Sequence, residues 1–327
     1  MKPVKKISII IPVFNEEDII DELVSRLEKA TENKDYDFEF IFVDDGSTDT
    51  TLFKLLALQN QHHKLKIVKL SRNWGHQNAY NAGLDNVSGN AVIFMDGDLE
   101  DPPEMTGEFI RKWEEGYDVV YAVKETRYES RFKKFMFYLF YQTLKRFSNV
   151  SVDKQAGMFS LIDEKVLHEL RNCREKNKYY VGLRYFVGFK QVKILYNRQK
   201  RHAGSPKQTY RRLVNYALDA IFSFSFLPIR LLTFFGFSIL LIISIATLFI
   251  ICAKLLKFNF WIFYDLPGWS SIVISIFFVL GVQLVFMGVL GEYIARILDE
   301  VRNRPYYIIE DIFEVTPNLN ESDKIKK

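Results

Sequence analysis

The chain contains only two cysteines, Cys173 and Cys252, and they lie far apart in a sequence of 327 residues. No cysteine spacing typical of a zinc site is present, so the sequence indicates neither a disulfide-stabilised fold nor a structural zinc site. The formal net charge is +4, which is too small to predict binding to nucleic acid. The Lys and Arg residues instead gather beside two long apolar runs that begin after Pro228.

The N-terminus lacks the small-residue cleavage site of a secretory signal peptide. Residues 1–6 are basic, but the apolar stretch that follows at 7–14 is short and contains Pro12. This stretch runs directly into the polar segment 15–18. We therefore expect residues 7–14 to form a first buried strand rather than a targeting segment.

Residues 1 to about 125 alternate between short β-branched runs and helical patterns. The β-branched runs lie at 7–14, 38–43, 65–70, 91–95 and 118–123. The helical patterns lie near 16–32, 48–61, 76–87 and 103–115. Strands that alternate with helices are typical of βαβ units, so the sequence predicts an α/β fold with a mostly parallel sheet buried on both faces. In such sheets the ligand site lies beyond the carboxyl ends of the strands.

Three polar clusters follow three of these predicted strands. Asn15-Glu16 follows the first, the segment 44–47 (Asp-Asp-Gly-Ser) follows the second, and Asp96-Gly97-Asp98 follows the fourth. Residues i and i+2 of an extended backbone point to the same side, so Asp96 and Asp98 can hold one Mg²⁺ or Mn²⁺ that carries a diphosphate. The alternative is an ordinary acidic turn, because Asp, Gly and Pro are also common turn residues.

Two apolar runs near the C-terminus are each long enough to cross a bilayer, at about 1.5 Å per residue. The spans are predicted at 229–253 and 270–294, with buried core helices as the alternative. Arg residues flank both runs on their outer sides, whereas the connecting loop 254–269 has only two Lys residues. The distribution of positive charge therefore predicts that both termini are cytoplasmic.

Two segments before the first span are both basic and aromatic. Residues 130–147 could form a helix that packs on the sheet or one that lies on an anionic bilayer, and residues 209–228 are better suited to the membrane surface. The predicted organisation is a cytoplasmic catalytic domain at 1–208, an amphipathic interfacial helix at 209–228, a first transmembrane helix at 229–253, an external loop at 254–269, a second transmembrane helix at 270–294 and a cytoplasmic tail at 295–327.

Four motifs at 11–16, 44–49, 70–77 and 95–104 together resemble the family 2 inverting glycosyltransferases, which have the GT-A fold. The match is best with the polyprenyl-phosphate glycosyltransferases, the group that includes the dolichol-phosphate mannose synthases. The segment 287–305 looks like the second span and exit of the bacterial members that have two spans. The resemblance covers about residues 5–310.

This resemblance implies which residues bind the donor. The implied nucleotide-binding residues are Pro12, Phe14, Asn15, Glu16, Asp44, Asp45, Asp96 and Gly97. Asp96 and Asp98 are the implied ligands of the Mg²⁺ or Mn²⁺ cofactor and, with Arg201 and Lys207, the implied catalytic residues.

Further residues are assigned to the sugar or to the lipid phosphate by the same resemblance. They are Glu100, Lys124, Arg127 and Arg131. The alternative for Lys124, Arg127 and Arg201 is an ordinary solvated basic face.

The implied reaction transfers a hexose from a nucleotide-diphosphate sugar to polyprenyl phosphate, with inversion. The first candidates are UDP-glucose and undecaprenyl phosphate, and GDP-mannose is a further possible donor. The implied setting is the bacterial plasma membrane, in a multi-pass protein that makes a lipid-linked sugar for modification of cell-envelope glycans. Gly281, Gly288 and Gly291 would also permit a homo-oligomer through the spans.

The chain departs from its relatives in two places. An acidic pattern common in relatives (Asp-Ala-Gly-Asp-Phe-Arg) reads Gln155 to Ser160 here, and a common Arg-Gly-Leu reads Val181-Gly182-Leu183 with Phe186. Two alternatives stay open: a glycan-elongating enzyme with a sugar acceptor, and an inactive membrane adaptor, which the departures at Gln155 to Ser160 allow. The Gln-x-x-Arg-Trp segment of elongating enzymes is absent from the sequence.

Overall fold

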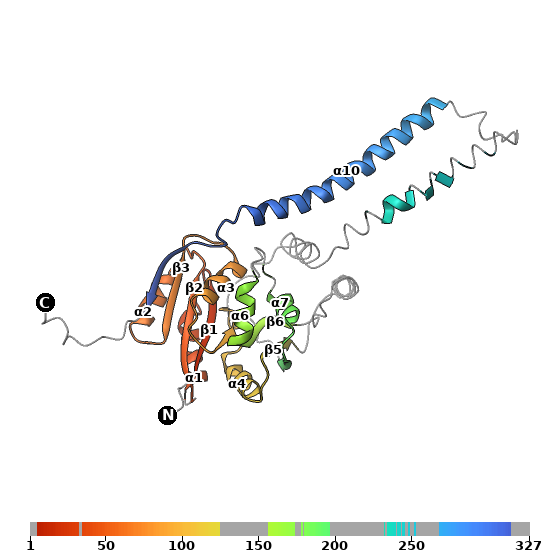
Figure 1. The fold of residues 1–327 in the computed structure, drawn as a ribbon. Coiled ribbons are helices and arrows are strands. Elements are labelled where there is room, and N and C mark those ends of the chain that lie inside the picture. Colours follow the sequence, from red (N-terminus) through yellow and green to blue (C-terminus); the bar gives the residue numbers. More distant parts are fainter. Residues whose placement is uncertain are drawn as a thin grey trace, which may run out of the picture. The chain divides into compact units, whose positions relative to one another are not determined.

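The computed structural model describes most of the N-terminal half of the chain and a long helix near its end (Figure 1). The described residues are 5–32, 35–124, 156–173, 178, 180–196, 232, 234–239, 241–242, 244–245, 248, 252 and 268–314. They divide into two compact units. The first holds the residues described up to 196 together with 305–314, and the second holds those described between 211 and 304.

In the described part of the chain, eight strands form one sheet in the order β7-β5-β6-β4-β1-β2-β3-β8. The strands are β1 (Lys6–Val13), β2 (Asp37–Asp44), β3 (Leu65–Leu70), β4 (Ala91–Phe94), β5 (Val119–Lys124), β6 (Ala156–Asp163), β7 (Gln191–Tyr196) and β8 (Ile309–Glu314). Strand β1 is parallel to β2 and β4, β2 to β3, and β5 to β7. Among the described strands, only β6 and β8 run antiparallel to their neighbours. The predicted mostly parallel α/β sheet is confirmed, including the first buried strand.

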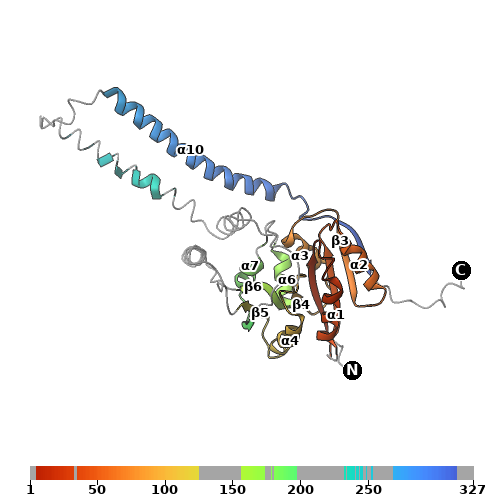
Figure 2. The same ribbon diagram turned by 180° about the vertical axis from the view of Figure 1, so that it is seen from behind.

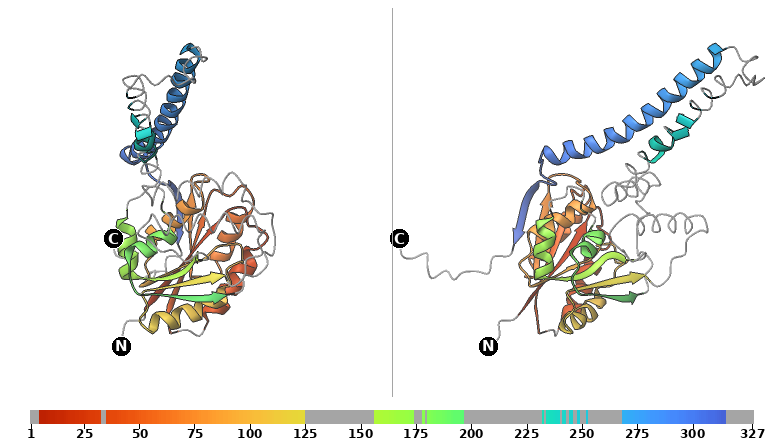
Figure 3. Two further views of the ribbon diagram at one scale, coloured as in Figure 1. Left: turned by 90° about the vertical axis from the view of Figure 1, so that its right-hand side faces the viewer. Right: turned by 45° about the vertical axis from the view of Figure 1, so that its right-hand side comes forward.

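Helices cover both faces of this sheet (Figures 2 and 3). The helices of the first unit are α1 (Ile20–Thr31), α2 (Thr51–Gln59), α3 (His76–Asp85), the short 3₁₀ helix η1 (Pro103–Met105), α4 (Thr106–Glu114), α6 (Glu164–Asn172) and α7 (Tyr180–Val187). Side chains of α1, α2 and α4 join one buried apolar cluster, and those of α3, α6 and α7 join the other. Strand β1 supplies both clusters, because its alternate residues point to opposite faces.

Helix α1 illustrates why these segments fold as they do. Its buried residues Ile20, Leu23, Val24 and Leu27 recur at the spacing of one helix face. Burial of each such side chain contributes about 1.5–3 kcal/mol relative to exposure. Acidic residues in its first turn interact favourably with the partial positive charge at the helix N-terminus.

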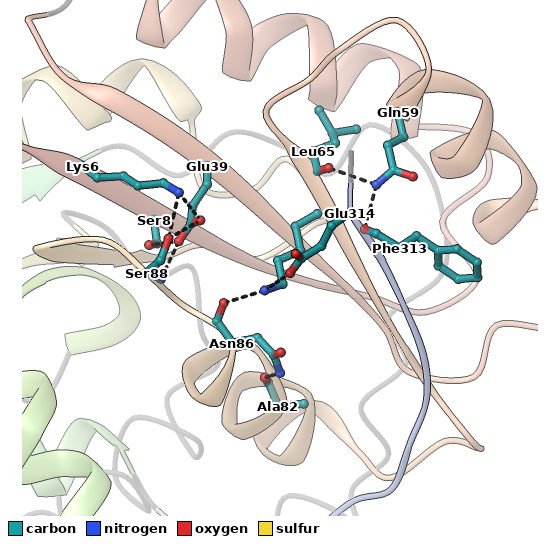
Figure 4. Close-up of polar contacts among 11 residues, drawn as sticks. Lys6, Ser8, Glu39, Gln59, Leu65, Ala82, Asn86, Ser88, Phe313 and Glu314 are labelled. Atoms are coloured by element: carbon teal, nitrogen blue, oxygen red, sulfur yellow. Dashed lines mark hydrogen bonds and ion pairs between the residues drawn. The ribbon is translucent and has the colours of Figure 1, made fainter. Parts of the chain in front are cut away.

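A polar cluster holds the amino-terminal side of the sheet together (Figure 4). Glu39 of β2 is almost fully buried and accepts hydrogen bonds from the Ser8 hydroxyl and from the Ser88 backbone N–H at 2.7 Å. Its other oxygen lies 2.7 Å from Lys6 Nζ. Burial raises the pKa of Glu39, but the bonds from Lys6, Ser8 and Ser88 outweigh it, so the net pKa is lowered.

We therefore expect Glu39→Gln to lower the free energy of unfolding by about 2 kcal/mol at pH 7, because a buried charge-assisted network is broken. A lowered folded-state pKa contributes stability above the unfolded pKa and loses it as pH falls through the folded value. The difference in Tm between Glu39→Gln and wild type should therefore shrink as pH falls below about 4. The control is Glu108→Gln, which removes an exposed ion pair with Arg111. It should change Tm little both at pH 7 and below about pH 4.

The last strand of the sheet follows the long C-terminal helix in sequence. Strand β8 lies alongside β3, antiparallel to it, as the edge strand (Figure 1). Gln59 donates through one amide nitrogen to the carbonyls of Leu65 and Phe313, at 3.0 and 2.7 Å (Figure 4). Lys69 pairs with Glu310 at 2.7 Å. Residues 309–314, within the predicted tail, are therefore part of the sheet.

The second unit contains helix α10 (Gly268–Val301), which includes the second predicted span. Its segment Ser275–Val301 has a mean hydropathy of 1.9, none of it is buried, and it is the one described helix long and apolar enough to cross a membrane. The predicted first span at 229–253 is described only at scattered positions, and the predicted helices at 130–147 and 209–228 lie outside the described residues.

Candidate active site

Three polar segments meet at one edge of the sheet because they follow neighbouring parallel strands. Strand β1 pairs with β2 as far as Val13 and Asp44, and with β4 as far as Ile10 and Phe94. The chain therefore leaves β1, β2 and β4 at the same edge, which is where open α/β sheets bind ligands. The predicted clusters at 15–16, 44–47 and 96–98 are brought together in this way.

The segment after β1 is tied to the start of α2. Asn15 has a positive φ of 52°, and its side-chain oxygen accepts the Thr48 N–H at 2.8 Å. The backbone N–H of Asn15 donates to Ser47 Oγ at 3.0 Å, and that of Glu16 donates to Thr51 Oγ1 at 2.9 Å. These reciprocal bonds fix the two implied nucleotide-binding residues in a defined turn.

The two aspartates at the end of β2 bind backbone N–H groups. Asp45 accepts the Trp74 N–H at 2.7 Å and the Gly75 N–H at 3.0 Å, one on each carboxylate oxygen. Asp44 is fully buried and accepts the Ser47 N–H at 3.0 Å. Burial raises the pKa of both carboxyls, and the backbone bonds oppose this rise. Asp45 therefore holds the loop after β3 against the end of β2.

Gly46 completes this contact between the two loops. Its φ is +71°, and a Cβ at this position would lie 2.5 Å from the carbonyl carbon of Arg72. Only glycine adopts this conformation readily, and only glycine allows so close a backbone approach.

We expect Gly46→Ala to lower the free energy of unfolding by about 2–4 kcal/mol, because it adds a backbone clash to an unfavourable φ. Gly116→Ala is the matched control, since Gly116 has a φ of +88° with nothing within 4 Å of the added Cβ. The control should cost about 1–2 kcal/mol from backbone strain alone. Equal losses in chemical unfolding of the two variants would contradict the close contact.

The acidic turn after β4, formed by residues 96–100, is held tightly against β1. A Cβ on Gly97 would lie 2.8 Å from the Pro12 carbonyl oxygen and 2.9 Å from a Val13 methyl group. Leu99 is fully buried with a φ of 60°, which is uncommon for a residue other than glycine. Asp98 accepts the Glu100 N–H at 3.1 Å across this residue. The turn is therefore fixed by packing on both sides.

Asp96 accepts two side-chain hydrogen bonds from helix α3. The Tyr80 hydroxyl donates to Asp96 Oδ1 at 2.7 Å, and His76 Nε2 lies 2.9 Å from the same oxygen. Desolvation lowers the pKa of His76, but the charges of Asp96, Asp98 and Asp45 outweigh it and the net pKa is raised. Burial and then the charge of Asp96 raise the pKa of Tyr80 well above its ordinary value.

Asp101 links the acidic turn to β7. Its Oδ1 accepts the Tyr196 hydroxyl at 2.8 Å, and its Oδ2 accepts the Asp96 N–H at 3.4 Å. Burial raises the pKa of Tyr196 most, followed by the charges of Asp101, Asp96 and Asp98. Negative charge is therefore concentrated at this end of the sheet.

Sequence reasoning did not assign roles to His76, Tyr80, Asp101 and Tyr196. His76 and Asp101 fall inside motifs quoted for the resemblance, but nothing in the pattern identifies their partners. A fully buried arginine was also missed. Arg184 of α7 donates to the Gly157 carbonyl at 2.9 Å, and its guanidinium lies 5.4 Å from the ring centre of Tyr121.

Some of the remaining predicted site residues lie in the described part of the chain, and others lie outside it. Pro12, Phe14 and Glu100 lie in the segments that meet at the sheet edge, and Lys124 is the last residue of β5. Arg127, Arg131, Gln155, Arg201 and Lys207 lie outside the described residues.

Asp96 and Asp98 suit a cation that takes its other ligands from a substrate. Among the described residues, no group of three or more His, Cys, Asp and Glu side chains could hold a metal ion alone. Mg²⁺ is commonly bound by one or two carboxylates, with phosphate oxygens and water completing its coordination. Two hard oxygen donors in a strongly negative turn fit that chemistry.

Comparison with known proteins shows the family. Residues 8–171 match the model of glycosyl transferase family 2. The chain is 36% identical over 313 residues to a bactoprenol glucosyl transferase of Shigella phage SfII, covering 93% of this chain and 97% of that protein. It is 39% identical over 309 residues to an uncharacterised glycosyltransferase of Synechocystis, covering 94% and 96%. The chain therefore belongs to glycosyltransferase family 2 and is a glycosyltransferase.

Among solved structures, glucosyl-3-phosphoglycerate synthase from Mycobacterium tuberculosis, in complex with Mn²⁺, UDP and phosphoglyceric acid, matches with a TM-score of 0.49. The match has 17% identity and covers 66% of this chain and 76% of that one.

Proposed function

We propose that this protein transfers a hexose from a nucleotide-diphosphate sugar to undecaprenyl phosphate or a similar polyprenyl phosphate, with inversion, using a GT-A domain. UDP-glucose is the first candidate for the donor. The observation that carries the proposal is the similarity to bactoprenol glucosyl transferases over nearly the full length of both chains. A match over 93% of this chain includes the apolar C-terminal region as well as the sheet.

The acidic turn is the proposed seat of the divalent cation, with Asp96 and Asp98 as its protein ligands. When bound there, Mg²⁺ or Mn²⁺ would stabilise the negative charge that the leaving diphosphate gains. The packing of Gly97 against β1 and the buried Leu99 would keep both carboxylates in place before the substrate arrives. Such preorganisation is how fixed charges lower a barrier most effectively.

The neighbouring loops are the proposed nucleotide pocket. Phe14 can stack on the base, while Asn15, Glu16, Asp44 and Asp45 would shape the wall around it. Asp45 would act chiefly by fixing the loop 72–75, since both of its oxygens accept backbone N–H groups. Arg201 and Lys207 remain the proposed cations for the diphosphate.

The acceptor chemistry does not require a strong general base. A phosphate monoester has a second pKa near about 6, so its oxygen is already largely ionised at neutral pH. The oxygen can attack C1 directly, and a single in-line displacement inverts the anomeric centre. Loss of the acidic residues in the segment 155–160 is compatible with this reaction. Lys124, Arg127 and Arg131 are the proposed contacts to the lipid phosphate, and Glu100 the proposed contact to the sugar.

Helix α10 is the proposed membrane anchor near the C-terminus, and 229–253 the proposed first span. A polyprenyl phosphate keeps its charged group at the bilayer surface, so the catalytic domain must work there. We propose a multi-pass protein of the bacterial plasma membrane, with the catalytic domain and both termini in the cytoplasm.

A panel of nucleotide sugars tests the donor and acceptor together. The purified full-length protein would be incubated with each sugar, Mg²⁺ and undecaprenyl phosphate, and the lipid products identified by mass. We expect one hexose to be transferred from UDP-glucose, with none transferred to undecaprenol, which has no phosphate. An oligosaccharide is supplied in a parallel incubation, and transfer to it instead of to the lipid phosphate would support the glycan-elongating alternative.

A further inference from the structure

Tyr80 of helix α3 has a side chain that is fully buried in the core. Its ring contacts Phe94 of β4, with 5.4 Å between ring centres, and meets the His76 ring edge-on at 4.8 Å. The ring is therefore packed between Phe94 and His76. The hydroxyl nevertheless reaches the acidic turn and donates to Asp96 Oδ1 at 2.7 Å.

Two donors on one helix converge on the same carboxylate oxygen. His76 and Tyr80 are four residues apart, so they lie on one face of α3, and His76 Nε2 is 2.9 Å from Asp96 Oδ1. The backbone N–H of Asp96 in turn donates to Asp101. The Asp96 carboxylate is thus held by Tyr80 and His76, and the Asp96 backbone is held by Asp101.

We propose that Tyr80 is a positioning residue that orients the Asp96 carboxylate for a divalent cation, with His76 as the second donor to the same oxygen. The inference rests on the proposed function, because it requires the cation site at Asp96 and Asp98. Groups that hydrogen-bond to a metal-binding side chain fix its orientation, and their loss commonly weakens metal binding by about 10- to 100-fold.

The chain supplies a matched control in Tyr180. Tyr180 is also buried, and its ring contacts the same Phe94 at 5.6 Å between ring centres. Its hydroxyl, however, donates to the Asn81 side chain and not to the acidic turn. Tyr80→Phe and Tyr180→Phe therefore remove the same atom from the same aromatic cluster, and only the first removes a hydrogen bond to Asp96.

The experiment measures Mn²⁺ binding to the full-length protein in detergent with saturating UDP, from the electron paramagnetic resonance signal of free Mn²⁺. We expect Tyr80→Phe to raise the Kd for Mn²⁺ by about tenfold. Tyr180→Phe should leave the Kd within about twofold of wild type. The Tm in EDTA, where no metal is bound, should be similar for the two variants.

Three results would overturn the inference. The first is an unchanged Kd for Mn²⁺ in Tyr80→Phe, and the second is an equal loss in Tyr180→Phe, which would indicate a general effect of the core. The third is a higher Kd for Mn²⁺ in Tyr80→Phe together with a Tm in EDTA that is much lower than the Tm of Tyr180→Phe. That result would indicate a structural role. If wild type binds UDP but no Mn²⁺, the proposed cation site fails as well. If Mn²⁺ binding shifts as expected but no lipid-linked sugar forms, only the proposed reaction fails.

Discussion

Asp98→Ala should reduce kcat/KM for lipid-linked sugar formation by about 10²- to 10³-fold, the usual effect of removing one group that stabilises transition-state charge. The carboxylate lies in the turn that would bind the cation, and the turn is also shaped by its bond to the Glu100 N–H. Loss of the charge should therefore weaken both cation binding and stabilisation of the leaving diphosphate. The assay measures transfer from UDP-glucose to undecaprenyl phosphate at saturating Mg²⁺.

Glu104→Ala is the control for this loss. Glu104 is an acidic residue a few positions further along, but it forms an ion pair with Arg26 at 2.8 Å rather than contributing to the turn. This pair is partly exposed, so its removal should leave kcat/KM within about twofold of wild type. Undiminished activity of Asp98→Ala would contradict the proposed role of the turn.

Gly97→Ala should reduce kcat by about 10²-fold although it removes no charge and no hydrogen-bonding group. The added Cβ would lie 2.8 Å from the Pro12 carbonyl oxygen and 2.9 Å from Val13, so the turn must move away from β1. A displacement of about 1 Å in a catalytic group is sufficient for a loss of that size. The measurement is kcat from steady-state transfer at saturating donor and acceptor.

Gly116→Ala, in the turn between α4 and β5, is the matched control for the glycine substitution. An added Cβ there has nothing within 4 Å, so it strains only a turn that carries none of the proposed site residues. We expect this variant to keep wild-type kcat. If Gly97→Ala also keeps it, the close contact between the turn and β1 has no part in catalysis.

The sequence was sufficient to predict the sheet and the edge where the polar clusters meet. The strands β1 to β4 are short, β-branched and buried, and each ends at a polar or acidic segment, so their common edge follows from local pattern, whereas their order in the sheet comes from the structure. The spacing of Asp96 and Asp98 is local too, so the sequence could predict a shared cation for their carboxylates, and this stays a prediction. The family resemblance implied that Asp45 binds the nucleotide, and the structure shows that its carboxylate binds the backbone of Trp74 and Gly75.

Strand β8 could not be predicted because its partner lies far away in the sequence. Lys69 pairs with Glu310 across 241 positions, and a 34-residue helix lies between β3 and β8. Periodicity identifies which face of a strand is buried, but not which distant strand it joins. The partnership of Tyr80 with Asp96 was missed for a similar reason, since an isolated tyrosine in a helical pattern indicates only a core position.

The measurement that tests the account most directly is the identity and anomeric configuration of the lipid product. The purified wild-type protein would be given UDP-glucose, whose glucose is α-linked, with Mn²⁺ and undecaprenyl phosphate, and the product examined by mass spectrometry and NMR. The account predicts a single glucose joined to the lipid phosphate in the β configuration, with none formed in EDTA and formation restored by Mn²⁺. An α-linked product, or full activity in EDTA, would contradict it.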